Sequence, residues 1–489
     1  MGVESKDSKD KGLGGTEDFE NKGLRELPRY WWYAWFTASM GQFVDAYDTL
    51  IIGAALLFLI PLWKLNAVDT GLLAASAFIG VAVGAPVFGS IADRVGRRFL
   101  YIFDLTFLVV FGLLSGLVYN FAELFITRLL VGIGVGGDYA LSPTLVAEYA
   151  PSKRRGFALA SMNSFWGIGS IVGFLTAYAL AVGLASNPNL AWRVMLASEA
   201  IWGLVVILLR TGILESPRWA EIQAKLGGAK KEKWEKEAED SIKKIAGSSD
   251  AKISTGQATK GSIKDLFRGK MWLVTLFAWV WWPVFDVAAY GANLYTPYIT
   301  AGLGLTSKAD AFLASALYWG IALLGYYTAA YYYDRIGRRI LVIVGSLIMG
   351  IDMFVGLAIY ESLKVLPFLA VLGLFSAYYY FMNFGPGPYT MTLAELWPTR
   401  VRGTGMGLAS TFSRIGAATS SFVIPSIVAA VGFGGALALL GAAILFVALW
   451  SFLMMPEASN LTPDELETRL YMGIFKNKKK EKASKPQVS

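Results

Sequence analysis

The sequence predicts an all-α membrane protein with twelve transmembrane helices in two six-helix bundles. Three observations lead to this fold class. The 489 residues are 55% hydrophobic and only 16% charged, with a mean hydropathy of +0.49, whereas soluble domains are about 25% charged. Apolar spans long enough to cross a bilayer, which takes about 20 residues, recur along the chain. The second half of the chain also repeats motifs of the first half.

The apolar spans divide evenly around a charged connector. Residues 214–270 contain the helix-prone stretch KKEKWEKEAEDSIKKIAG between Ser/Gly-rich segments, so we expect a soluble segment there. Five parts follow: a cytoplasmic tail, a first bundle, the connector, a second bundle and a basic cytoplasmic tail, at residues 1–28, 29–213, 214–270, 271–455 and 456–489. The predicted spans are about 30–63, 70–92, 99–119, 121–149, the stretch after 151–156, 191–213, 271–303, 307–333, 339–361, 366–397, 403–431 and 434–455.

The charges of the loops predict the orientation. Basic residues fall in alternate loops, while the opposite loops offer little beyond Lys64, Lys308 and Lys364. By the positive-inside rule, both termini of this multi-pass cell-membrane protein should be cytoplasmic. The loop bases are Arg94, Arg97, Arg98, Lys153, Arg154, Arg155, Arg335, Arg338, Arg339, Arg400 and Arg402.

The tails and the net charge suggest few partners. Residues 1–28 lack an apolar core, so they do not resemble a signal peptide. The net charge of +8 lies in loops and tails and needs no nucleic acid to explain it. The final basic run KNKKKEKASK could contact anionic lipid, although we expect it to be mainly solvated. We expect a monomer.

The composition excludes several classes of function. The chain has no cysteine and no histidine, which excludes disulfides, thiol chemistry and a His/Cys metal cluster. It also lacks a paired nucleophile and base and a GxxxxGK[ST] loop. We therefore expect no enzyme, no cofactor and no metal, and energy from an ion gradient in place of ATP. Without histidine, the side chain that binds a transported proton near neutral pH must be a carboxylate.

The two halves of the chain share motifs at matched positions. ADRVGRR at 92–98 returns as YDRIGRR at 333–339, and AEYAPSKRRG at 147–156 returns as AELWPTRVRG at 394–403. The offset that separates Asp93 from Asp334 also separates Asp45 from Asp286. Two bundles related by a parallel repeat, with substrate bound between them near the midplane, form a transporter architecture.

These motifs resemble those of the major facilitator superfamily over about residues 29–455. D-R-x-G-R-R follows the second and eighth spans, and E-x-x-P-x-x-x-R-G follows the fourth and tenth. The resemblance implies that acids and arginines pair between the bundle ends and gate the protein without touching substrate. The residues with this expected role are Asp93, Arg94, Arg97, Arg98, Glu148, Arg155, Asp334, Arg335, Arg338, Arg339, Glu395 and Arg402.

One apolar stretch, WWPVFDVAAYG at 281–291, carries a carboxylate at bilayer depth. Trp282, Asp286 and Tyr290 are four residues apart, so they share one face of a helix. An aspartate at the centre of a membrane helix costs roughly 2.5–3.5 kcal/mol on insertion scales, so it faces a cavity or a partner. The flanking indole and phenol favour a ligand pocket. The alternative is an interhelical hydrogen bond that only positions the helix.

Within the superfamily, the chain most resembles the phosphate:proton symporters. Asp45-Ala-Tyr-Asp48 is similar to their first-helix acidic motif, and Gly137-Asp138-Tyr139 to their fourth helix. Asn383-Phe-Gly-Pro386 resembles their tenth helix, and Arg414 stands where they keep a basic residue on the eleventh. The resemblance implies substrate contact by Tyr139, Trp166, Trp282, Asp286, Tyr290, Asn383 and Arg414. It implies proton coupling by Asp45, Asp48, Asp138 and Asp286.

The chain departs from that family at two places. Trp166 stands where the family offers a glutamine, and 387–389 replace an Asn-Thr-Thr run after F-G-P. Two neutral donors for an oxyanion are therefore missing, and Asn163, about one turn before Trp166, could replace one. Arg414 still favours an anion, because a buried cation is costly unless something negative pairs with it. An acid of the protein could also fill that role.

We therefore interpret the chain as a proton-coupled symporter that imports a small anion by alternating access, phosphate first and an organic acid second. A sugar:proton symporter is the alternative, because ESPRW at 215–219 and GPGPY at 385–389 are loosely similar to sugar porters. Against it, the seventh helix lacks the paired glutamines of those proteins. A non-transporting nutrient sensor of the same fold is a further class, although the tails show no signalling domain.

Overall fold

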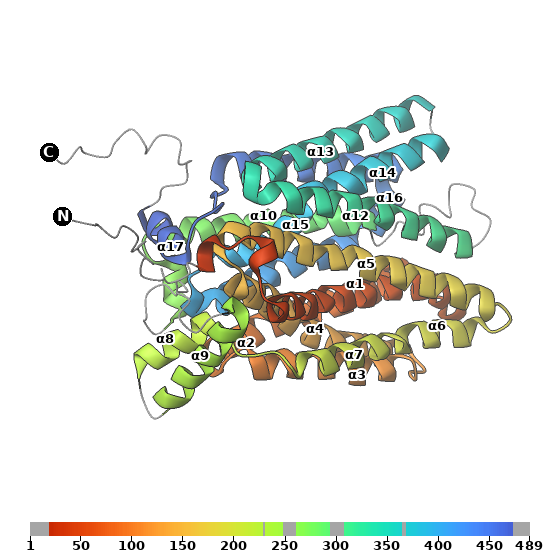
Figure 1. Ribbon diagram of the computed structural model, residues 1–489. Coiled ribbons are helices and arrows are strands. Elements are labelled where there is room, and N and C mark those ends of the chain that lie inside the picture. The colour runs from red at the N-terminus through yellow and green to blue at the C-terminus, as the bar shows by residue number, and fades with distance from the viewer. Residues whose placement is uncertain (1–18, 228–229, 248–260, 294–307, 364–367, 473–489) are drawn as a thin grey trace, which may run out of the picture.

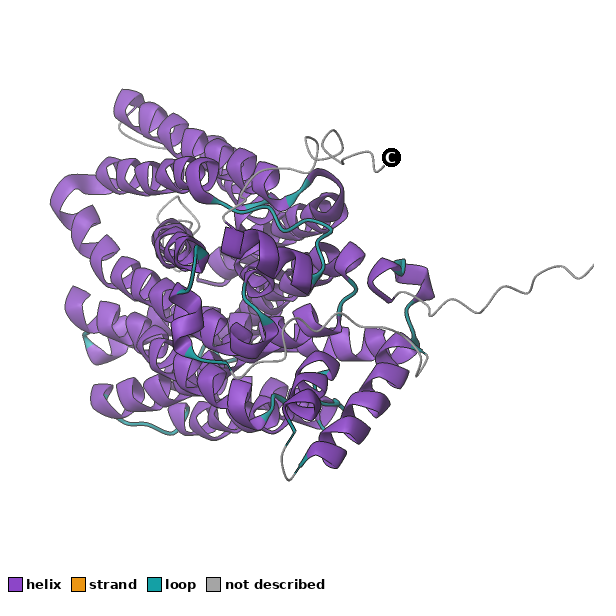
Figure 2. Ribbon diagram, turned by 90° about the vertical axis from the view of Figure 1, so that its left-hand side faces the viewer, coloured by secondary structure: helices purple, strands orange, loops and turns teal. Residues whose placement is uncertain are grey.

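A computed structural model describes residues 19–227, 230–247, 261–293, 308–363 and 368–472, and in these residues it contains helices and no strands (Figure 2). Ten of the described helical segments are long and apolar enough to cross a membrane. The predicted all-α membrane fold is confirmed. The end of the predicted seventh span (294–303), Lys364 and the basic run after residue 472 lie outside the described residues.

The first bundle consists of six spans, drawn from red to yellow in Figure 1. The sixth span is α6 and α7, which meet at Ser198. The bounds are α1 Arg29–Trp63, α2 Ala67–Val95, α3 Arg98–Ser115, α4 Phe121–Tyr149, α5 Arg155–Gly183, α6 Pro188–Ala197 and α7 Glu199–Arg210.

The second bundle also has six spans in the described residues, with two breaks. The tenth span is interrupted. Its first part, α14, ends at Phe384, and its second part, α15, begins at Pro386, a residue that has no N–H for a helical hydrogen bond. The eleventh and twelfth spans run together as α16, which turns sharply where Gly432 has φ +74°. The bounds are α10 Met271–Asn293, α12 Lys308–Ile336, α13 Arg338–Leu363, α14 Phe368–Phe384, α15 Pro386–Thr392 and α16 Arg402–Met454.

Glycines let neighbouring helices approach backbone to backbone. A Cβ on Gly80 or Gly84 of α2 would collide with carbonyl oxygens of α4, and one on Gly132 of α4 would collide with Ala77. The same holds between the bundles, where a Cβ on Gly407 of α16 would meet the Ala85 carbonyl of α2. Small residues at such crossings are the usual way to pack helices in a membrane, where burial of apolar surface gives no driving force.

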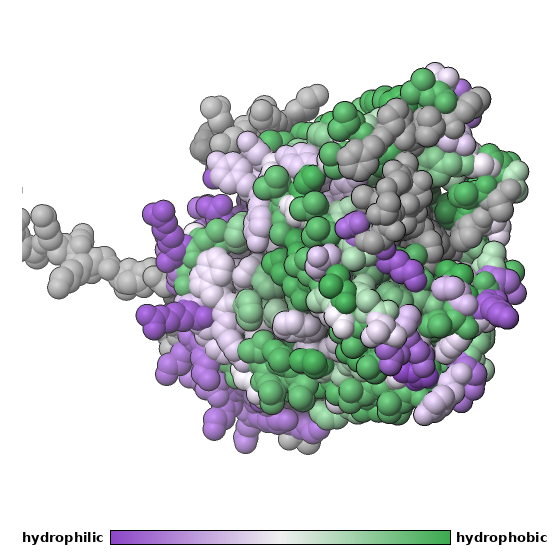
Figure 3. All heavy atoms as spheres, turned by 90° about the vertical axis from the view of Figure 1, so that its right-hand side faces the viewer, coloured by the Kyte–Doolittle hydropathy of each residue, from purple (hydrophilic) through white to green (hydrophobic). Residues whose placement is uncertain are grey.

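One end of the molecule carries the short helices outside the membrane spans, and we call it the connector end. It holds α8 Pro217–Leu226 and α9 Lys231–Ala246 of the connector, α17 Pro463–Met472, and the 3₁₀ turn η1 at Phe19–Asn21 (Figure 1). Figure 3 shows the opposite end, where broad apolar areas lie between groups of hydrophilic side chains.

Glu20 connects the segment before the first span to this end of the first bundle. Its carboxylate lies 2.8 Å from Arg218 Nη2 of α8 and accepts a hydrogen bond from the Ser152 N–H at 2.9 Å. Burial on its own raises the pKa of Glu20, but Arg218, Arg155 and the bonds from Ser152 hold that pKa below its ordinary value. The segment is therefore pinned by an ionised acid.

Two carboxylates join the bundles at the connector end in a symmetric way. Asp93 on α2 accepts hydrogen bonds from the backbone N–H groups of Gly403 and Thr404, at 3.1 and 2.7 Å. Asp334 on α12 accepts bonds from the backbone of Gly156 and Phe157, at 3.0 and 2.8 Å. Each acid thus binds the start of a helix in the other bundle, where free N–H groups and the helix dipole favour an anion.

Buried arginines reinforce this junction. Within the first bundle, Arg97 Nη2 lies 3.1 Å from Glu148 Oε1. Arg402 of the second bundle places its Nη1 3.3 Å from the same oxygen. Arg338 pairs with Glu395 at 3.1 Å. The repeat is imperfect, because Arg155, the counterpart of Arg402, bonds Ser152 and the Leu461 carbonyl. The side chains of Arg94, Arg98 and Arg335 are exposed, and that of Arg339 is half-buried.

We expect Asp334→Ala to separate the bundles at the connector end, because it removes two hydrogen bonds to an ionised acceptor. Such bonds contribute about 1.5–3 kcal/mol each, so the open population should rise at least tenfold. The measurement is the distance between spin labels on cysteines introduced at Arg94 and Ile336, both exposed. Arg335→Gln, the exposed neighbour, is the control and should leave the distances unchanged. Identical distance distributions in Asp334→Ala and the unmodified chain would contradict the role of this bond.

Candidate substrate site

A cavity of about 50 Å³ lies between the two bundles. Residues of α1, α4 and α5 line it from the first bundle, and residues of α10, α12, α14, α15 and α16 line it from the second. A buried water needs roughly 10–15 Å³ by a comparable measure, so the space suits a small ion. The lining includes every residue predicted to contact substrate, namely Tyr139, Trp166, Trp282, Asp286, Tyr290, Asn383 and Arg414.

Arg414 is the cation of this cavity. Its side chain is 2% exposed, and Nη1 donates a hydrogen bond of 2.6 Å to the Tyr290 hydroxyl. The guanidinium carbon lies 4.3 Å from the centre of the Tyr139 ring and 5.1 Å from that of Tyr290, so both rings contribute cation–π attraction. Its Nε has no hydrogen-bond partner in the described residues. The guanidinium therefore keeps a donor for a further group.

Asp286 supplies the opposite charge. Its Oδ2 lies 3.9 Å from Arg414 Nη1 and accepts a bond of 2.5 Å from the hydroxyl of Ser413, the preceding residue on α16. At 3.9 Å the two charges attract without a direct hydrogen bond between them. The pair can therefore be opened by a competing anion at a lower cost than a bidentate pair would have.

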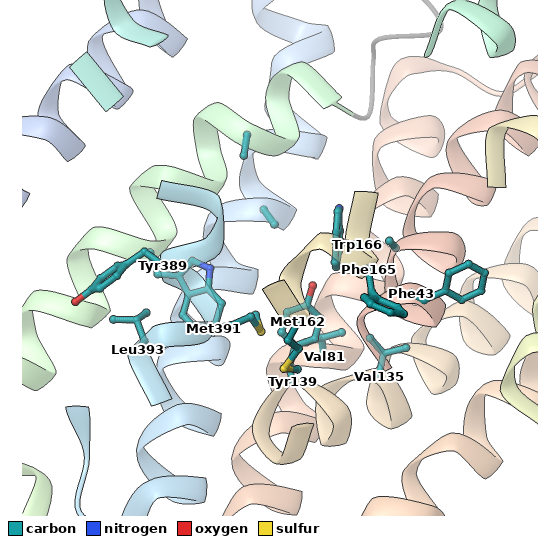
Figure 4. Packing of buried hydrophobic residues seen from close by; sticks show 14 of the residues in the cluster. Phe43, Val81, Val135, Tyr139, Met162, Phe165, Trp166, Tyr389, Met391 and Leu393 are labelled. Atoms are coloured by element: carbon teal, nitrogen blue, oxygen red, sulfur yellow. The ribbon is translucent and has the colours of Figure 1, made fainter. Parts of the chain in front are cut away.

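Aromatic rings form much of the wall. The Tyr139 and Trp166 ring centres are 6.1 Å apart, and the Trp166 and Tyr290 centres are 6.4 Å apart, both edge to face. These edge-to-face contacts join α4, α5 and α10, so the row of aromatic rings crosses from one bundle to the other. Figure 4 shows Tyr139 and Trp166 of the first bundle, with Met391 of the second bundle facing them. Trp166 thus fills the place of the expected glutamine with an apolar surface.

Several polar lining residues were not predicted, although one of them had a signal in the sequence. Gln42, Asn293 and Trp319 line the cavity from α1, α10 and α12. Asn293 lies seven residues after Asp286, which is two helical turns, so extending the Trp282–Tyr290 stripe by one more turn finds it. Asn163 also lines the cavity, but its amide already donates to the Gly387 carbonyl at 2.8 Å.

The other acids predicted for proton coupling lie outside the cavity lining, inside the first bundle. Asp48 Oδ1 lies 2.5 Å from Arg128 Nη2, and Nη1 of the same arginine lies 3.0 Å from Glu199 Oε2. Asp138 pairs with Arg210, which also binds Asp104 at 3.1 Å. Sequence reasoning missed Glu199, Asp104 and Arg210, because no spacing along the chain pairs side chains on different helices.

Asp45 differs from its neighbours. It is fully buried, and neither carboxylate oxygen has a hydrogen-bond partner in the described residues. It lies about one turn after Gln42, which lines the cavity. Asp45 is thus about one helical turn along α1 from a residue that lines the cavity.

Comparison with known proteins gives the family. The family described as "Sugar (and other) transporter" matches residues 34–470. The chain belongs to this family. The protein YaaU of Escherichia coli (strain K12) is 30% identical over 426 residues, which cover 87% of this chain and 91% of YaaU. The low affinity inorganic phosphate transporter 4 of Petunia hybrida is 28% identical over 458 residues, covering 82% and 84% of the two chains.

A solved transporter has the same fold. The proton:xylose symporter XylE of E. coli, a major facilitator superfamily protein solved with 6-bromo-6-deoxy-D-glucose, matches with a TM-score of 0.75 and 25% identity. The match covers 90% of this chain and 98% of XylE. The chain is therefore a major facilitator superfamily transporter, as its repeated motifs predicted, and a multi-pass membrane protein.

We expect Arg210→Met to destabilise this transporter, because it leaves Asp104 and Asp138 without their buried cation. Removing one partner of a buried ion pair costs about 3–5 kcal/mol. The measurement is the midpoint of thermal unfolding of the purified protein. Arg94→Met removes an exposed arginine and should change stability by only about 0.5 kcal/mol. Equal midpoints for the two variants would show that the Arg210 cluster contributes nothing to stability.

Proposed function

We propose that this transporter is a proton-coupled symporter that imports a small anion by alternating access, with inorganic phosphate as the leading substrate and an organic acid as the next. The observation that supports it is Arg414, a buried cation that lines the cavity between the bundles and lies 3.9 Å from the carboxylate of Asp286. A cation held there is costly unless something negative pairs with it, and its partial pairing with Asp286 leaves room for a ligand.

Asp286 is the proposed coupling residue. A bound anion and an ionised Asp286 would compete for Arg414 and repel each other in a site of low dielectric. Anion binding therefore favours the protonated carboxyl, and loss of that proton on the cytoplasmic side favours release. In this proposal Asp286 exchanges its proton with each transport cycle, while Asp45, Asp48 and Asp138 form the path in the first bundle.

We expect Asp286→Asn to bind its anion and exchange it across the membrane but to fail to accumulate it against a gradient, because an amide mimics only the protonated state. The measurement is uptake of labelled phosphate into proteoliposomes, with and without an imposed pH gradient. The matched control is Asp352→Asn on α13, a half-buried membrane acid that does not line the cavity. If Asp286→Asn still accumulates phosphate when driven by pH, the coupling proton sits elsewhere, with Asp45 the next candidate.

A sugar:proton symporter is the second candidate, and the comparison with XylE favours it. The relative from Petunia is named as a phosphate transporter, whereas XylE carries xylose with a proton. The two candidates make different demands on the site. An anion needs the charge of Arg414, whereas a neutral sugar needs only hydrogen-bonding groups.

We expect Arg414→Gln to weaken phosphate binding about tenfold or more while changing the binding of a neutral sugar much less, because only the anion loses a charge partner and charged hydrogen bonds are worth about 1.5–3 kcal/mol. Equilibrium binding of phosphate and of xylose to the purified variant measures this. Unchanged phosphate binding in Arg414→Gln would remove the basis of the anion proposal and support the sugar.

The orientation and the gate complete the proposal. The connector end carries the basic loops, so we place it, both tails and residues 214–270 in the cytoplasm, with residues 29–213 and 271–455 as the two moving bundles. The bonds of Asp93 and Asp334 then close the cytoplasmic side in this conformation. In this proposal the buried arginines and glutamates of the repeated motifs act as the gate, and substrate never contacts them; they are Arg97, Arg338, Arg402, Glu148 and Glu395.

A further inference from the structure

Several polar atoms of the cavity wall have no hydrogen-bond partner in the described residues. They are both amide atoms of Gln42, the Oδ1 atoms of Asn293 and Asn383, the indole N–H of Trp319 and Nε of Arg414. The three amide side chains are 0%, 5% and 1% exposed. Buried polar groups are almost always paired, and a ligand that displaces water from this cavity must replace the bonds that water made.

The unpartnered atoms include acceptors as well as donors. Asn383 donates its amide N–H to the Tyr379 carbonyl at 2.8 Å, which fixes its Oδ1 as an acceptor. A Cβ on Gly387 would lie 2.8 Å from that oxygen, so the glycine keeps it accessible. The Asn293 amide nitrogen faces the Met382 sulfur at 3.7 Å, which leaves its Oδ1 as a second acceptor. Gln42 offers one donor and one acceptor whichever way its amide is turned.

The charge of the cavity sets a second condition. Arg414 is the sole lysine or arginine among the lining residues that the structure describes, and Asp286 is the sole acid. When Asp286 carries the coupling proton, the site has one positive charge. A singly charged anion neutralises it, whereas a dianion leaves a buried negative charge without a partner, which is costly in a low dielectric.

We propose that the cavity selects a small, singly charged oxyanion that brings hydroxyl donors of its own, which Asn293, Asn383 and Gln42 recognise through their carbonyl oxygens. This rests on the proposed function, and it narrows the substrate to dihydrogen phosphate or a short hydroxycarboxylate. Arg414, Gln42 and Trp319 bind the anionic oxygens. Asn293 and Gln42, which no motif singled out, become residues that determine specificity.

This requirement for a single negative charge and for hydroxyl donors excludes anions of the same size that lack a hydroxyl. Sulfate carries two charges and no donor at neutral pH, so it would leave both asparagine oxygens unpaired. A simple carboxylate such as propionate matches the charge but not the acceptors. Sites built to bond a hydroxyl reject analogues that lack it, because the buried group of the protein is then left unpaired.

The test is equilibrium binding of matched anions to the purified full-length chain. Glycolate and propionate have the same heavy-atom count and differ by a hydroxyl in place of a methyl group. Phosphate at an acidic pH, where it is the monoanion, is compared with sulfate. We expect glycolate to bind about tenfold or more tightly than propionate, and phosphate than sulfate, since each unpaired acceptor costs at least about that factor.

Variants assign the effect to the named residues. Asn293→Leu and Asn383→Leu should weaken glycolate and phosphate while leaving propionate binding in place, and retained propionate binding reports a folded site. Met391→Leu, a volume-conserving change in the same cavity wall, should leave the glycolate-to-propionate ratio unchanged.

The possible failures are distinguishable. If sulfate and propionate bind as well as phosphate and glycolate, and Arg414→Gln abolishes all four, the hydroxyl inference is wrong while the anion transporter stands. If xylose binds and none of the anions competes with it, the proposed function is wrong, and this inference falls with it.

Discussion

A charge inside the hydrocarbon layer must be matched within the protein, and this requirement governs the interior of the molecule. Arg128 lies between Asp48 and Glu199, and Arg210 lies between Asp104 and Asp138, all fully or almost fully buried. Each of these arginines has two acids within ion-pair distance. Arg414 has one among the described residues, with 3.9 Å between its Nη1 and Asp286 Oδ2. The less completely matched charge is the one that lines the cavity, which is what separates a binding residue from a structural one.

The fold was largely predictable because it follows from local signals. Apolar length, loop charge and the repeat indicated the spans. The repeated motifs also contain the residues of both bundles that bond to each other at the connector end. Asp93 and the Gly403 N–H belong to two motifs far apart in sequence, yet they meet because each bundle supplies one motif of each kind. The break at Gly385 was harder to predict, since it depends on the close approach of α13. A Cβ there would collide with the Leu341 carbonyl.

The site was predictable only in part. The stripe of Trp282, Asp286 and Tyr290 follows from helical spacing, and Asn293 would have followed from the same rule. Tyr139, Trp166, Asn383 and Arg414 came from a resemblance, because their convergence depends on helices far apart in the sequence. The pairings of Asp104, Glu199 and Arg210 had no such signal. Tertiary packing decides whether a buried acid binds an arginine or, like Asp45, has no hydrogen-bond partner among the described residues.

The pairing of Arg414 with Asp286 also explains, on the proposed mechanism, why anion and proton would move together. In the empty carrier the ionised acid neutralises the arginine, so the site that must pass between its two conformations carries no net charge. With a monoanion and a proton both bound, the site is again neutral. With the anion alone it would carry one uncompensated negative charge in a low dielectric, and with the proton alone one positive charge. Both half-loaded states are disfavoured by burial, so the two neutral states are the ones able to change conformation, and coupling follows from charge balance at a single pair of side chains.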